Sequence, residues 1–140
     1  MRRPSAVPAS VGTDLVHVEG LAQRLAGLPG LGEALFTPAE RAGAASRAQS
    51  AQALAACFAA KEAFLKAVGR GLSPSGVDAW LQQVEVEAGE GPPRLRLHGE
   101  AAACLQRRGQ HALLSLAADG GHALATVVLV PAAAPAGRVA

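Results

Sequence analysis

Two kinds of stretch along the chain predict β-strands: those in which apolar and polar residues alternate, and those in which β-branched residues cluster. They lie at residues 11–18, 81–87, 94–98, 111–116 and 122–130. The second and third are joined by Gly-Glu-Gly-Pro-Pro, and the last two by a segment with a strong turn signal, Asp119-Gly120. Each of these pairs is therefore expected to form a hairpin.

Apolar residues recur at helical spacing between the predicted strands. Leu21, Leu25 and Leu28 predict a helix over residues 19–28, which Pro29 and Gly30 end. Thr37, with Pro38 and Glu40 after it, has the capping-box pattern that begins a short helix reaching about residue 45. The remaining predicted helices are a long one over about residues 48–68, ended by Gly69, and one over residues 99–108.

Hairpins combined with helices predict an α+β fold rather than a doubly wound parallel sheet. A length of 140 residues suits one domain. We expect this domain to span residues 11–130. The Pro-, Ser- and Ala-rich residues 1–10 are expected to form a flexible leader, and residues 131–140 a flexible tail.

The composition predicts a thin hydrophobic core. Half of the residues are apolar, but many of these are alanine and only 3% of the chain is aromatic. Burying more surface in an oligomer would compensate for such a core. The net charge of +2 does not point to nucleic acid, and no apolar run is long enough to span a membrane. With no signal-peptide pattern in the sequence, a cytoplasmic protein is expected.

Asp14 is the first candidate functional residue, because it lies in an apolar predicted strand, within Gly12-Thr13-Asp14. Burying a carboxylate without a partner is costly, and a metal ion or a cationic side chain would relieve that cost. The alternative is that Asp14 faces solvent or caps the following turn.

The second candidate region is Lys61-Glu62-Ala63-Phe64-Leu65-Lys66, which contains both lysines of the chain. Glu62 and Lys66 share one face of the predicted helix, since they are four residues apart. They form either an ordinary surface ion pair, worth a few tenths of a kcal/mol, or a polar site beside the apolar stripe that includes Phe58.

Together the two regions resemble a known family. Phosphopantetheinyl transferases of the acyl-carrier-protein synthase type begin with a Gly-Thr/Ile-Asp strand and carry Phe-Ala-Ala-Lys-Glu-Ala-Phe-x-Lys-Ala-x-Gly on the central helix. The first, weakly specific motif is matched by Gly12-Thr13-Asp14, and the second, highly specific one by Phe58 through Gly69. The resemblance extends over residues 11–130, and the chain is identified as a diverged member of this holo-acyl-carrier-protein synthase family.

The resemblance implies an antiparallel sheet packed with a long central helix, and transfer of 4'-phosphopantetheine from coenzyme A to a serine of an acyl or peptidyl carrier protein. It implies that Asp14 and Glu62 hold Mg²⁺, that Lys61 and Lys66 contact coenzyme A, and that Glu62 and Lys66 act in catalysis. Mg²⁺ prefers such carboxylate oxygens together with phosphate oxygens and water. Family members are typically homotrimers with each site between two subunits.

Three positions depart from the family pattern. Cys57 stands where an arginine usually precedes the helix motif, and Ala117-Ala118 stands where a Ser-His pair helps to hold coenzyme A. These two changes remove contacts to phosphate that are each worth about 1.5–3 kcal/mol; Arg41 or Arg70 could replace them. The third departure is His17, in place of a glutamate; it is either a base, a group behind the metal ligands or a structural residue.

The departures leave three hypotheses open. The first is an active phosphopantetheinyl transferase. The second is a repurposed relative that keeps the trimeric scaffold and acts on a carrier-bound or small-molecule intermediate, in an apolar cleft between subunits near Cys57, Ala117 and Ala118. The third is a non-catalytic module that binds a carrier protein. The retained Asp14, Glu62 and Lys66 favour the first, with Mg²⁺ as the metal and coenzyme A as the substrate.

Overall fold

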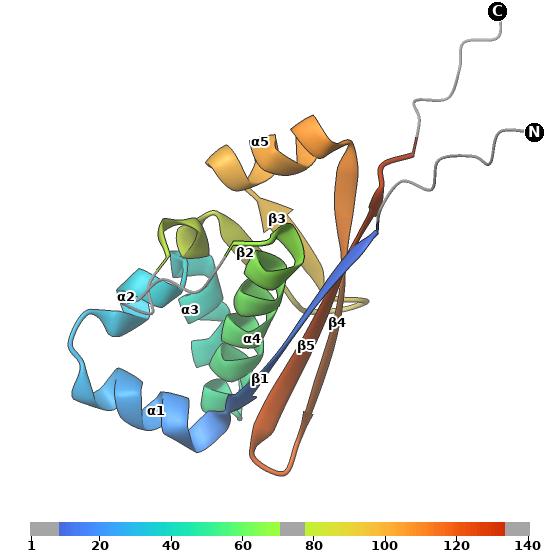
Figure 1. The fold of residues 1–140 in the computed structure, drawn as a ribbon. Helices are drawn as coiled ribbons and strands as arrows, with labels where there is room; N and C mark the ends of the chain where they lie inside the picture. Colours follow the sequence, from blue (N-terminus) through green and yellow to red (C-terminus); the bar gives the residue numbers. More distant parts are fainter. Residues whose placement is uncertain (1–8, 71–77, 134–140) are drawn as a thin grey trace, which may run out of the picture.

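The computed structural model describes residues 9–70 and 78–133, and the larger sheet of this described part has three antiparallel strands (Figure 1). These strands are β1 (Ser10–His17), β4 (Gln110–Asp119) and β5 (His122–Pro131). Their order is β1-β5-β4, so the strand that carries Gly12-Thr13-Asp14 pairs with a strand more than a hundred residues later in the sequence. The β4–β5 hairpin confirms the predicted one.

Helix α4 (Ser50–Val68) is the centre of the molecule (Figure 1). It packs on one face of the three-stranded sheet, and the short helices of residues 18–45 lie on its other side. The remaining elements are α1 (Val18–Gly27), α2 (Leu31–Leu35), α3 (Pro38–Ala45), the 3₁₀ helix η1 (Ala79–Gln82), the hairpin strands β2 (Val84–Glu87) and β3 (Arg94–Leu97), and α5 (Gly99–Arg108). None of the helices in the described residues is long and apolar enough to cross a membrane.

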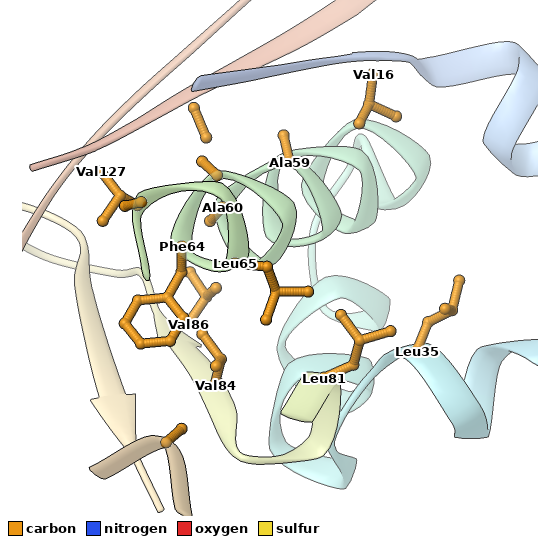
Figure 2. Close-up of a cluster of buried hydrophobic side chains, with 14 of the residues drawn as sticks. Val16, Leu35, Ala59, Ala60, Phe64, Leu65, Leu81, Val84, Val86 and Val127 are labelled. Carbon is orange, nitrogen blue, oxygen red and sulfur yellow. The ribbon is translucent and has the colours of Figure 1, made fainter. Parts of the chain in front are cut away.

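Small residues on α4 allow the core to be thin. Figure 2 shows Ala59 on the side of α4 nearer to Val16, while Phe64 extends away from that side toward Val84 and Val86 of β2. Alanine at such positions lets a helix and a sheet approach closely, and the few larger buried side chains fill the space on the other side of the helix. The predicted thin core is therefore present, with α4 between a part that faces the three-stranded sheet and a part that faces β2.

Gly12 is where β1 and α4 come closest. A Cβ atom at this position would overlap the carbonyl oxygen of Ala63 and lie 2.7 Å from the amide nitrogen of Ala67. These are backbone atoms of a helix, so they cannot move aside cheaply. We expect Gly12→Ala to lower the free energy of unfolding by about 1–3 kcal/mol, the usual cost of overpacking.

Urea denaturation of Gly12→Ala measures this cost, with Gly27→Ala as the matched control. A Cβ at Gly27, in the last turn of α1, meets no atom within 4 Å. Equal stability of the two variants would contradict the close packing of β1 on α4.

Three local predictions were wrong. Val18 begins α1 rather than ending β1, because the His17 side chain accepts the backbone N–H of Gly20 and caps the helix. Helix α2 was missed, since five residues are too few to show a helical period. Leu81 was expected at the start of a strand, but it lies in η1, which begins where the Asp78 side chain accepts the N–H of Trp80.

The predicted domain limits fall within strands. Ser10 begins β1 and Pro131 ends β5, so each strand extends one residue into a segment predicted to be a leader or a tail. Most of the loop predicted after Gly69, through Gly76, lies outside the described residues.

Candidate active site

Asp14 faces α4 rather than open solvent. Gly12, Asp14 and Val16 occupy the positions of β1 that point toward the helix, and the Asp14 side chain is 18% exposed. The Lys66 ammonium lies 2.9 Å from Asp14 Oδ1 and donates a second hydrogen bond to the Thr13 carbonyl oxygen at 3.0 Å. Lys66 therefore pairs with Asp14, and of the two alternatives left open the ordinary surface pair with Glu62 is not the one that forms.

Glu62 lies beside this ion pair with its carboxylate unpaired. Its side chain is buried, and within the described residues no donor hydrogen-bonds to it. Burial, followed by the negative charge of Asp14, raises the pKa of Glu62, and the positive charge of Lys66 opposes this rise only in part. The fold thus brings together Asp14, Glu62 and Lys66, and it leaves them with an excess of negative charge.

This arrangement suits a divalent cation. A carboxylate on a largely buried side chain, without a donor among the described residues and next to a second carboxylate, is stabilised by a cation between them. Among the described residues no group of three or more Asp, Glu, His or Cys side chains could enclose a metal on its own. Mg²⁺ fits such a half-built site, because it commonly takes one or two carboxylates and completes its coordination with water and substrate phosphate.

Lys61 has a different position from the one expected. Its side chain is fully buried, its ammonium lies 2.6 Å from Glu40 Oε1, and it also donates to the carbonyl oxygen of Leu81. Burial lowers the pKa of Lys61, although Glu40 opposes that shift. An ammonium enclosed in this way has no surface to offer a coenzyme phosphate, so the expectation that Lys61 binds coenzyme A is corrected to a structural role.

Glu40 is a structural residue that the sequence revealed only in part. The capping box predicted its bond to the backbone N–H of Thr37, which is present at 2.8 Å. Its other oxygen accepts the backbone N–H of Val86 at 2.8 Å, and its first oxygen also receives Lys61. One buried carboxylate therefore ties α3, β2 and α4 together, which no local sequence pattern could show.

His17 has a structural role in this conformation. Its Nδ1 accepts the backbone N–H of Gly20 at 3.1 Å and so caps α1, while its ring lies 5.1 Å from that of His122. A cap of this kind stabilises the start of the helix that follows β1. Of the alternatives open for His17, the geometry supports the structural one.

The residues that replace the family's phosphate-binding groups do not share one cleft. Cys57 lines a cavity of about 840 Å³, whereas Ala118 lines a separate one of about 460 Å³. Seven charged residues line the first cavity: Glu40, Arg47, Glu85, Glu87, Glu90, Arg94 and Arg96. Burial raises the pKa of Cys57 to about 12, which makes the thiol inert. Within one chain, Cys57 and Ala118 therefore line separate cavities, and the hypothesis of an apolar cleft between subunits stays a prediction.

Comparison with known proteins identifies the class. A family model described as the 4'-phosphopantetheinyl transferase superfamily matches residues 10–127, and the chain belongs to this family. Its relatives are of the acyl-carrier-protein synthase type. The chain is 44% identical over 124 residues to a holo-[acyl-carrier-protein] synthase of Anaeromyxobacter dehalogenans, covering 85% of this chain and 93% of the relative. A holo-[acyl-carrier-protein] synthase of Syntrophotalea carbinolica is 43% identical over 122 residues, covering 86% and 94%.

Solved structures agree with this assignment. The ACPS–CoA complex of Chronobacterium ammoniagenes superposes with a TM-score of 0.75 at 35% identity, covering 89% of this chain and 98% of that one. The acyl carrier protein synthase of Mycobacterium tuberculosis gives a TM-score of 0.66 at 32% identity, covering 87% and 96%. The predicted α+β fold of the acyl-carrier-protein synthase type is thereby confirmed.

Proposed function

We propose that this protein transfers 4'-phosphopantetheine from coenzyme A to a serine of an acyl or peptidyl carrier protein, with Mg²⁺ held by Asp14 and Glu62. The observation that carries the proposal is the convergence of Asp14, Glu62 and Lys66 from β1 and α4. Family membership supplies the reaction, and the unpaired buried carboxylate supports the metal. Because the reaction draws on coenzyme A, we place the protein in the cytoplasm.

In this reaction the serine hydroxyl oxygen forms a bond to the phosphorus that bears the pantetheine. The bond from that phosphorus to the bridging oxygen breaks, and adenosine 3',5'-bisphosphate leaves. Bound Mg²⁺ would neutralise charge on the pyrophosphate. Lys66 would place its ammonium against the phosphate oxygens, where the charge of the leaving group develops. Asp14 holds that ammonium in position.

The exposed face of the three-stranded sheet supports assembly with other copies of the chain. The face opposite α4 carries apolar side chains in matching register across all three strands. The large ones among them are Val11, Leu15, Leu113 and Leu124, exposed by 64%, 61%, 52% and 39%. The apolar residues form two rows, separated by the hydroxyl row of Thr13, Thr126 and Ser115. Two exposed apolar rows on a chain with a thin core favour burial in an interface. We propose the homotrimer that the family resemblance implies.

The directions in which Cys57 and Glu62 point from α4 support a coenzyme A site located between subunits. Glu62 and Cys57 are five residues apart on α4, so they point roughly 140° away from each other around the helix. The cavity at Cys57 and the Asp14–Lys66 pair therefore face different directions in one chain. A single coenzyme A would reach both only if each came from a different subunit.

The interface proposal predicts the effect of a charge on the sheet face. We expect Leu15→Glu to convert the assembled protein into monomers, because three buried carboxylates close together would repel one another and lose water. Size-exclusion chromatography with light scattering measures the mass. Leu28→Glu is the matched control, since Leu28 is 52% exposed but lies after α1, outside the sheet. Trimers of the Leu15 variant would exclude this face as the interface.

Intact-mass spectrometry tests the proposed activity. A panel of apo carrier proteins would be incubated with this protein, coenzyme A and Mg²⁺. A gain of one phosphopantetheine on a carrier establishes the transferase. A well-folded protein that modifies none of them contradicts the proposal and favours a repurposed relative or a non-catalytic carrier-binding module.

A further inference from the structure

Arg70 is held in a fixed orientation at the end of α4. It follows Gly69, whose left-handed backbone ends the helix. Its Nε and Nη2 atoms donate to the two oxygens of Asp78 at 3.1 Å and 3.0 Å, and its guanidinium lies 4.1 Å from the centre of the Trp80 ring. The plane of the guanidinium is therefore set from two sides, yet 40% of the side chain stays exposed.

This group is close to the candidate active site. Arg70 follows the left-handed Gly69, and its backbone N–H turns back to the carbonyl oxygen of Leu65 at 2.9 Å, next to the Lys66 that contacts Asp14. Its partner Asp78 is near enough for its negative charge to contribute to the raised pKa of Glu62. The exposed guanidinium of Arg70 is thus near the active-site carboxylates and Lys66, where we place the phosphates of coenzyme A.

We propose that Arg70 is a phosphate-binding residue for the coenzyme A donor, and that it supplies a cation in a chain where Cys57 has replaced one. This inference rests on the proposed function. A guanidinium that presents a planar fork to a carboxylate presents the same fork to a phosphate. Trp80 can keep the plane of Arg70 fixed while a phosphate oxygen takes the place of an Asp78 oxygen.

The contacts of Asp78 allow this exchange. Asp78 Oδ1 also accepts the backbone N–H of Trp80 at 2.8 Å, so its carboxylate keeps a donor when Arg70 turns to a phosphate. Asp78 on this view competes with the donor for Arg70.

Two substitutions separate phosphate binding from a purely structural role. Arg70→Gln removes the cation and should weaken coenzyme A binding by about 10- to 100-fold, the value of one or more charge-assisted hydrogen bonds. Asp78→Asn removes the competing charge, while its side-chain oxygen can still accept the Trp80 N–H. It should leave binding unchanged or make it tighter. A residue that merely braced the backbone would give losses of the same sign from both substitutions.

The measurement is the dissociation constant of coenzyme A with Mg²⁺, obtained by titration calorimetry on the full-length protein. Arg107→Gln is the control, because Arg107 is an exposed α5 arginine paired with Glu100. Weaker binding by the Arg70 variant, without weaker binding by the Asp78 variant, supports the inference. An unaffected Arg70 variant, or equal losses in both variants, overturns the inference about Arg70. In that case, carrier modification by the wild type still supports the proposed transferase activity. A wild type that neither binds coenzyme A nor modifies a carrier overturns both.

Discussion

Glu62→Gln is expected to reduce kcat/KM for carrier modification by more than 100-fold. The side chain keeps its volume, but it loses the carboxylate that we propose as a ligand of Mg²⁺. Groups that merely orient metal ligands typically cost roughly 10- to 100-fold when they are removed, and a ligand should cost more. Initial rates of phosphopantetheine transfer, followed by intact mass at several Mg²⁺ concentrations, measure the effect.

The same variant has an expected signature in stability. Because burial and Asp14 raise the pKa of Glu62, its ionisation costs folded-state stability as the pH rises through that pKa. Glutamine has no such cost, so without metal the variant should unfold at a temperature no lower than that of the wild type at pH 7. Mg²⁺ should raise the unfolding temperature of the wild type more than that of the variant.

Glu100→Gln serves as the control for Glu62→Gln, since Glu100 is an exposed carboxylate on α5. It should leave both the rate and the response to Mg²⁺ unchanged. A fully active Glu62→Gln enzyme would show that the buried carboxylate is not a metal ligand.

Lys61→Met is expected to lower the free energy of unfolding by about 3–5 kcal/mol, the usual cost of removing one partner of a buried ion pair. The substitution leaves the buried Glu40 carboxylate without the ammonium 2.6 Å away. The Leu81 carbonyl oxygen also loses a donor. Urea denaturation, with the slope compared between variants, gives the loss.

A double-mutant cycle tests whether the loss comes from the pair. Glu40→Gln alone should also be strongly destabilising, since it leaves the Lys61 charge buried. The Lys61→Met/Glu40→Gln double variant should lose several kcal/mol less than the sum of the two single losses. Additive losses would mean that the two charges do not depend on each other. The KM for coenzyme A of folded Lys61→Met enzyme should stay unchanged, which separates this structural role from the coenzyme contact first expected.

The parts of the site that sequence could predict are those set by local spacing. A recognisable motif runs along one helix, and the Gly-Thr-Asp strand is short enough to read directly. Asp14, Glu62 and Lys66 were predicted in this way, and the structure brings them together. Their pairing was not predictable, because whether Lys66 reaches Asp14 or Glu62 depends on how closely β1 packs on α4.

The direction in which Lys61 points could not be predicted from its neighbours. Adjacent residues of a helix point about 100° apart, so Lys61 and Glu62 face different surroundings despite being consecutive. The partner of Lys61 lies in α3, and the same partner accepts a backbone N–H from β2, 46 residues away. Contacts of this kind are set by tertiary packing, and a single sequence has no local pattern for them.

The order of strands in the larger sheet has a consequence for the newly synthesised chain. In the described structure β1 takes its strand pairing from β5 alone, which leaves the ribosome more than a hundred residues later. Until then the backbone around Asp14 has no strand to hold it, although α4 with Glu62 and Lys66 can already form. Domains generally fold as units, and pairings this distant in sequence form slowly. The carboxylates would therefore take up their final arrangement only at the end of synthesis, so an unfinished chain would lack the site that we propose for Mg²⁺ and coenzyme A.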